Sequence, residues 1–124
     1  MDMKRPTLLR KLAKLAVITH TAEPEDTPPR DCFGYSTEEE NRIAVADVRE
    51  RRSRSQWGWC CVLTTAAIGE FSASVALGCC SYESLDDFVA CEGKQQSDEA
   101  IDALLSKLYW ARSLGKKATE LLRP

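Results

Sequence analysis

Apolar and polar residues alternate through residues 57–82, and this alternation constrains the fold more than any other feature of the chain. A strict period of two is typical of a β-strand that buries one face. The positions on the apolar face are Cys60, Val62, Thr64, Ala66 and Ile68 in the first run, and Phe71, Ala73, Val75, Leu77 and Cys79 in the second. A tight turn at Gly69-Glu70 pairs Ile68 with Phe71, which brings both sets onto one face of the pair. The sequence therefore predicts a β-hairpin with one apolar face.

Two helix starts follow the hairpin. Ser84, with Asp87 three residues later, predicts the cap of a short helix that ends at Gly93. Ser97 predicts the cap of a second helix over residues 98–122. The apolar residues that repeat at helical spacing in this second helix are Ile101, Leu104, Leu105, Leu108, Ala111, Gly115, Ala118 and Leu122. A helix of this length spans roughly 37 Å, so we expect it to cover the hairpin.

The N-terminal part of the chain divides into a basic amphipathic segment and a linker. Leucines recur on one helical face of residues 1–18, which predicts a helix. Three prolines within residues 20–33 disfavour a continuous helix there and predict a linker. We therefore expect an arm and linker over residues 1–33 and a compact domain over residues 34–124.

The segment between the linker and the hairpin fits two interpretations. Ser36 with Glu39, or Thr37 with Glu40, predicts a capping box at the start of a helix. Partial alternation over Ile43–Arg51 leaves a third strand as the alternative. In either case the predicted fold class is α+β. It consists of a small antiparallel sheet of two or three strands, packed against a long C-terminal helix, with an N-terminal helical arm.

The six cysteines bear on redox state and on metal binding. The apolar N-terminal stretch is interrupted by Arg10, Lys11 and Lys14, so it does not resemble a signal peptide, and no run approaches the roughly 20 apolar residues of a membrane helix. We therefore expect a cytoplasmic protein without a membrane partner, whose cysteines are reduced and act as small buried hydrophobes. A zinc site would need Cys60 and Cys79, as cross-strand neighbours, to meet Cys32 and Cys91. The spacing matches no zinc knuckle, and no metal or cofactor is expected.

Catalytic chemistry has little support in the sequence. The single histidine, His20, falls in the predicted linker, and no phosphate-binding loop or dinucleotide fingerprint is present. Carboxylates lie at helix starts, where capping explains them. We expect no catalytic residue and no enzyme activity.

Charge and tryptophan placement point to binding instead. Residues 83–102 carry seven acids against Lys94 alone. Trp57 and Trp59 are predicted to share the face opposite the main apolar set, either covered by the N-terminal helix or available to a partner. The predicted partner-binding residues are therefore Glu83, Asp86, Glu92, Asp102, Trp57 and Trp59.

An alternative surface is basic. Its residues are Arg49, Arg51, Arg52 and Arg54, which together with the basic N-terminal arm could bind nucleic acid. No aromatic residues interleave with these arginines to form a stacking platform. The sequence does not determine the oligomeric state.

Two stretches of the hairpin and its exit resemble a known motif. Trp57-Gly58-Trp59-Cys60, the run Leu77-Gly78-Cys79-Cys80-Ser81-Tyr82-Glu83-Ser84 and the pair Asp87-Phe88 match the pattern W-x-W-C followed by L-G-x-C-S-Y-x-S-x-x-D-F. This pattern is similar to that of small uncharacterised proteins of tailed bacteriophages and prophages, over residues 56–93. The family typically continues with a Gly-Tyr-rich segment, where this chain has Gly93-Lys94-Gln95-Gln96.

The resemblance implies a phage or prophage origin and carries no known activity. Together with the lack of catalytic residues, it leads us to expect an accessory protein that binds a protein or ribonucleoprotein complex of the bacterial host stoichiometrically. The most concrete version is an anti-CRISPR-like inhibitor of a defence system. The alternative is a nucleic-acid-associated regulator that uses the arginines. The motif itself is interpreted as structural first, because Ser81 and Ser84 suit the strand-to-helix junction and Tyr82 and Phe88 suit packing on the sheet.

Overall fold

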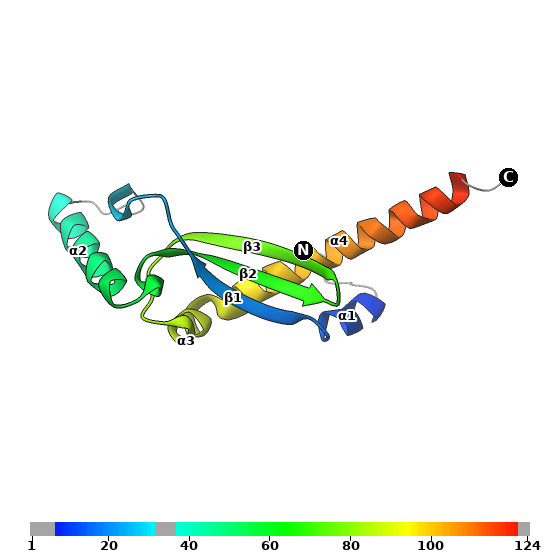
Figure 1. The fold of residues 1–124 in the computed structure, drawn as a ribbon, viewed down its shortest axis with the longest axis horizontal. Helices are drawn as coiled ribbons and strands as arrows, with labels where there is room; N and C mark the ends of the chain where they lie inside the picture. Colours follow the sequence, from blue (N-terminus) through cyan, green and yellow to red (C-terminus); the bar gives the residue numbers. More distant parts are fainter. Residues whose placement is uncertain (1–6, 32–36, 122–124) are drawn as a thin grey trace.

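The computed structural model describes residues 7–31 and 37–121. Its elements, in chain order, are α1 (Thr7–Ala13), β1 (Val17–Glu23), the 3₁₀ turn η1 (Pro29–Asp31), α2 (Glu38–Arg54), the 3₁₀ turn η2 (Gln56–Gly58), β2 (Cys60–Ile68), β3 (Phe71–Cys80), α3 (Leu85–Phe88), the π-helical turn η3 (Val89–Gly93) and α4 (Lys94–Leu121). The strands form one antiparallel sheet in the order β1-β2-β3, and α4 crosses one face of it (Figure 1). The predicted α+β class is confirmed. Within the described ranges, no helix combines the length and apolarity needed to cross a membrane.

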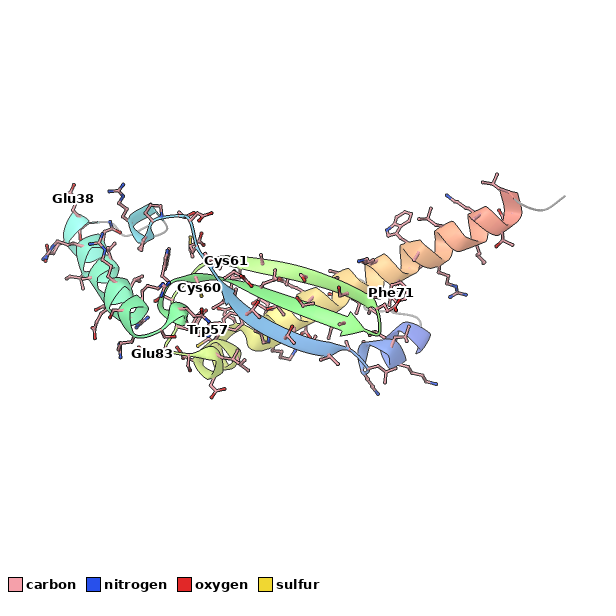
Figure 2. The ribbon with its side chains drawn as sticks, viewed as in Figure 1. Glu38, Trp57, Cys60, Cys61, Phe71 and Glu83 are labelled. Atoms are coloured by element: carbon pink, nitrogen blue, oxygen red, sulfur yellow. The ribbon has the colours of Figure 1, made fainter. Side chains whose placement is uncertain are left out.

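The hairpin has the predicted turn. Ile68 pairs with Phe71 across Gly69, whose φ of 58° is a conformation that glycine adopts without steric penalty. Inward residues of β2, including Val62 and Thr64, are fully buried. Figure 2 shows Phe71 at the turn, and Trp57 and Cys60 at the opposite end of the sheet.

The register shifts by one residue near the open end of the hairpin. Val62 pairs with Leu77, but the next aligned pair is Cys60 with Cys80, so β3 contains an extra residue. Cys79 lies at this β-bulge with a φ of 57°. The prediction that Cys79 lies on the apolar face opposite Cys60 is therefore wrong: the bulge turns Cys80 into the core instead.

The third strand comes from a part of the chain that was predicted to be helix and linker. All seven residues of β1 pair with β2, and their alternate residues are partly buried, so residues 17–23 form an edge strand. The alternative third strand over Ile43–Arg51 is wrong, because those residues lie within α2. Of the two predicted caps, Thr37 caps α2: its hydroxyl accepts a hydrogen bond from the Glu40 amide at 3.1 Å. Ser36 lies outside the described residues.

Gly93 does not end a helix, and Ser97 does not cap one. The chain passes from α3 through η3 directly into α4, so Ser97 lies inside α4. Gly93 is buried, and a Cβ at this position would lie 3.1 Å from Cγ1 of Val89. The glycine therefore allows close packing of η3 rather than providing a stop signal.

Two hydrophobic clusters lie between the sheet and its helices. The cluster nearer the hairpin turn is built on Ala66, Ala100 and Leu104. The cluster at the open end is built on Cys60, Val62, Cys80 and Phe88, and Trp57 and Tyr82 pack against it. The covered face of the sheet is thus divided between α4 at one end and the α3 region at the other.

Candidate functional site

Phe88 is the centre of the open-end cluster and is fully buried. Its ring centroid lies 5.2 Å from that of Tyr82, 5.3 Å from that of His20 and 5.7 Å from that of Trp57. The Tyr82 amide donates to the Trp57 carbonyl at 2.8 Å, which ties the chain entering β2 to the chain leaving β3. Several motif residues therefore meet in one packed cluster, which supports a structural role for them.

The strand-to-helix junction is held by two short-range hydrogen bonds. The Ser84 hydroxyl accepts from the Asp87 amide at 3.2 Å, and the Asp87 carboxylate accepts from the Glu83 amide at 2.9 Å. The first bond is that of an N-cap, and the second differs from a capping box because Asp87 accepts from the residue before the N-cap; both bonds satisfy backbone donors at the helix start. The predicted cap at Ser84 is confirmed.

His20 lies half-buried in β1, with its ring beside Phe88, and not in a linker. Its Nδ1 is hydrogen-bonded to Oγ1 of Thr64 at 2.7 Å, and Thr64 is itself fully buried. Burial lowers the pKa of His20 below its ordinary value of 6.5, because the protonated ring loses hydration. This ring is therefore neutral at pH 7 and contributes to packing.

The cysteines differ in environment. Cys60 and Cys80 are free, and burial raises their pKa to about 11 and about 12, so both stay protonated near neutral pH. Cys91 is free and exposed. Cys79 is disulfide-bonded, so the prediction that all six cysteines are reduced is wrong at this position. A cytoplasmic location stays a prediction.

The zinc alternative requires Cys32, Cys60, Cys79 and Cys91 to converge. No group of three or more His, Cys, Asp or Glu side chains is placed to hold a metal ion within residues 7–31 and 37–121. Cys32, which the zinc alternative requires, lies outside those residues.

The two tryptophans do not share a surface. Trp57 lies in η2 rather than in a strand, and it packs with the apolar set that it was predicted to oppose. Trp59 is buried, and its indole Nε1 donates to the Thr27 carbonyl at 3.0 Å. The period-two argument fails for Trp57 because the strand begins only at Cys60. The segment after β1, and not a helix, reaches Trp59.

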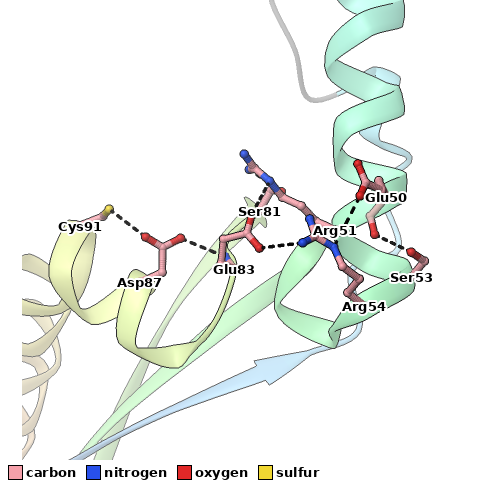
Figure 3. Close-up of polar contacts among 8 residues, drawn as sticks. All are labelled: Glu50, Arg51, Ser53, Arg54, Ser81, Glu83, Asp87 and Cys91. Atoms are coloured by element: carbon pink, nitrogen blue, oxygen red, sulfur yellow. Dashed lines mark hydrogen bonds and ion pairs between the residues drawn. The ribbon is translucent and has the colours of Figure 1, made fainter.

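Glu83 pairs with the basic cluster that was proposed as the alternative binding surface (Figure 3). Its carboxylate lies 3.3 Å from Nε of Arg51 and 3.6 Å from Nη1 of Arg54. Arg51 also donates to the Ser81 hydroxyl at 3.4 Å, so the contacts join α2 to the turn after β3. Glu83, a predicted partner-binding residue, thus makes ion pairs within its own chain. Arg49 and Arg52 remain exposed at the end of α2.

The other predicted acids are distributed over three elements. Asp86 is exposed on α3, Glu92 is half-buried on η3 and Asp102 is half-buried on α4. Burial, with a further contribution from Glu92, raises the pKa of Tyr82 to about 12. Glu92 therefore lies near the edge of the Phe88 cluster.

One of them, Asp102, lines a groove between η3 and the first half of α4. We call this the acidic groove. It has a volume of about 410 Å³ and is lined by Val89, Ala90, Cys91, Lys94, Gln95, Asp98, Glu99 and Asp102. Lys94 donates to Asp98 at 3.1 Å and Gln95 donates to Glu99 at 3.4 Å, and the lining contains three acids and one base. Val89 is 46% exposed and supplies an apolar wall. The groove can therefore contact both a cationic and an apolar group of a partner.

A second exposed surface was not predicted from the sequence. From Tyr109 to Leu121, α4 has no buried residue, and the helix extends beyond the hairpin turn (Figure 1). Lys107 marks the point of departure, because its Nζ donates to the Ser72 carbonyl of β3 at 2.9 Å. The large apolar side chains exposed on this projecting half are Tyr109, Trp110, Leu114 and Leu121. The lengths of the elements could have predicted this surface, because α4 is longer than the sheet that it covers. Its 28 residues rise about 42 Å, whereas the ten residues of β3 span about 33 Å.

No protein-family model matches the chain, and neither does any curated protein or solved structure. The resemblance to phage proteins therefore stays a prediction from the motif.

Proposed function

We propose that the protein acts by stoichiometric binding to another macromolecule, and that the acidic groove is its contact site. The observation that carries this proposal is the combination of Asp98, Glu99 and Asp102 with the exposed Val89 in one groove. Carboxylates attract a cationic surface and speed its encounter, while the apolar wall favours a protein side chain. The same carboxylates repel phosphates, which favours a protein surface over nucleic acid.

The motif of residues 56–93 directs the proposal to a bacterial host. A protein that presents carboxylates to a basic groove can occupy the place of nucleic acid there, and defence complexes bind nucleic acid through such grooves. Inhibition of a defence system, anti-CRISPR-like in type, is the most concrete form of the proposal. The choice of target is an inference by analogy with phage proteins, whereas the charge complementarity is inferred from the residues of the groove.

The test compares two double variants. Val89→Lys with Asp98→Lys changes one apolar residue and one carboxylate of the groove. Ile43→Lys with Glu70→Lys makes the same two chemical changes at exposed positions on α2 and in the hairpin turn, and serves as the control. Both variants should keep the circular dichroism spectrum of the parent.

The readout is plaque formation by a phage on bacteria whose defence system blocks it, with each variant expressed in the host. The parent protein and the control should raise the plaque count, and the groove variant should not. Capture from the same lysate, followed by mass spectrometry, should show a host protein that the groove variant no longer retains. If the groove variant protects the phage and captures the same protein as well as the parent does, the groove is not the contact site.

A further inference from the structure

The exposed side of α4 forms one continuous stripe from its first half to its end. In steps of three or four residues, the stripe contains Glu99, Ala103, Ser106, Trp110, Leu114, Lys117 and Leu121, and we call it the α4 seam. None of these residues is buried, although Ala100 and Leu104, which lie roughly 80–120° around the helix axis from the stripe, are fully buried against the sheet. Residues at this spacing lie on one face of a helix, as they do in a coiled coil. From Ser106 to Leu121 the α4 seam is exposed, and Glu99 at its start also lines the acidic groove.

Charge along α4 is strongly asymmetric. Residues 94–102 contain three acids and one base, whereas residues 107–117 contain four bases and no acid. A parallel pair of α4 helices would set like charges against each other. An antiparallel pair would set the acidic half of each helix beside the basic half of the other. The helix is thus complementary to itself in one orientation only.

Side-chain size follows the same symmetry. A two-fold axis at Trp110 gives the pairs Glu99 with Leu121, Ala103 with Lys117, Ser106 with Leu114, and Trp110 with its own copy. Each small residue of the α4 seam then faces a long one, which lets two helices approach closely. Lys117 would lie within one turn of Glu99 of the other copy, so the charges and the sizes select the same register.

We infer that the chain forms a two-fold symmetric dimer in which the α4 helices of two copies pack antiparallel along the α4 seam. The occupant of the projecting half is thus a second copy of this chain. The sheet contacts α4 through Ala100 and Leu104, which lie off the α4 seam, and the second half of α4 extends beyond the hairpin turn, where the sheet does not obstruct the approach (Figure 1). Contact along the α4 seam would remove Trp110, Leu114 and Leu121, which are 63–85% exposed, from water.

The experiment is sedimentation velocity of the full chain over a concentration series. The parent should show a monomer–dimer equilibrium. Trp110→Glu and Leu114→Glu should each weaken dimerisation by roughly 100-fold or more, because each buries an unpaired charge at the seam. Tyr109→Glu is the matched control: this exposed aromatic neighbour lies outside the α4 seam and its substitution should leave the dimer intact. Circular dichroism confirms that each variant is folded.

Charge reversal tests the orientation. Glu99→Lys alone and Lys117→Glu alone should each weaken the dimer by up to about fivefold, and the double variant should restore it, because the pair is exposed at the rim. In a parallel dimer the double variant would not differ from the parent. A parent that stays monomeric throughout, a dimer that tolerates Trp110→Glu and Leu114→Glu, or a double variant no tighter than the singles would overturn the inference.

Discussion

Phe88 and Trp110 are large aromatic residues of the same chain, yet Phe88 is fully buried and Trp110 is 63% exposed. Around Phe88, three aromatic rings converge from β1, the entry to β2 and the exit of β3. Around Trp110, the only ring contact among the described residues is with its neighbour Tyr109, at 6.3 Å. The open end of the hairpin thus buries its own aromatic residues, whereas the projecting half of α4 leaves them exposed.

This contrast separates two uses of apolar surface. Burial around Phe88 contributes to the stability of the monomer, because those rings leave water when the chain folds. The apolar side chains of the projecting half gain little from folding and can gain from association. Substitutions in the two regions should therefore affect different measurements.

The largest expected effect is that of Phe88→Ala. Truncation of a fully buried phenylalanine should lower the free energy of unfolding by about 3–5 kcal/mol, from lost burial and the cavity left behind. Trp110→Ala, measured at a concentration where the protein is monomeric, should change it by less than about 0.5 kcal/mol, because the side chain is exposed. Urea unfolding followed by circular dichroism checks both. Equal losses of unfolding free energy in the two variants would contradict the contrast between the buried Phe88 and the exposed Trp110.

A smaller effect concerns pH. The pKa of His20 is lowered in the folded protein, so the unfolded chain takes up a proton first as the pH falls below about 6.5. The contribution of the neutral ring is present above that pH and is lost as the pH falls toward the folded pKa. The melting temperature should therefore drop between pH 7 and pH 5. Glu25 is not the cause of this drop, because hydrogen bonds from backbone amides lower its pKa further below that range.

His20→Asn is the variant that isolates this effect. It should be less stable than the parent at pH 7, because the contact with Thr64 and Phe88 is altered, but its melting temperature should change less between pH 7 and pH 5. A variant with the same pH dependence as the parent would assign the effect to another group.

The smallest expected effect is that of Glu83→Gln. The two ion pairs of Glu83 join exposed side chains, so their loss should cost no more than about 1 kcal/mol. Part of the difference should disappear in high salt, because the pairs are screened. Urea unfolding at low and high salt measures this. A loss comparable to that of Phe88→Ala would place the ion pairs, rather than the aromatic cluster, at the centre of this end.

Local patterns in the sequence predicted the elements that obey them. The alternation with a period of two predicted the turn at Gly69 and the burial of Val62. The helical repeat from Ile101 onward predicted the long helix α4. The bulge at Cys79 has no such signal, because one extra residue in a ladder depends on how the strand packs. The strand β1 was missed because it is short and because Pro24, which follows it directly, suggested a linker. The side chains of Val17–Glu23 nevertheless alternate between exposed and half-buried.

The site was less predictable than the fold. Glu83 and Arg51 are 32 positions apart, and only the packing of α2 against the turn after β3 brings them together. Trp59 is hidden by Thr27, which lies in a segment without regular structure. Such contacts between distant segments leave no periodic pattern. The projecting half of α4 could have been found by comparing helix length with strand length.

Hydrogen exchange followed by mass spectrometry, at two protein concentrations on either side of dimer formation, tests the central contrast most directly. Amides of residues 109–121 should exchange rapidly in the dilute sample and become protected in the concentrated one. Amides of β2 and of residues 80–88 should be equally protected in both, because the Phe88 cluster needs no second chain. Protection of residues 109–121 that does not depend on concentration would contradict the account.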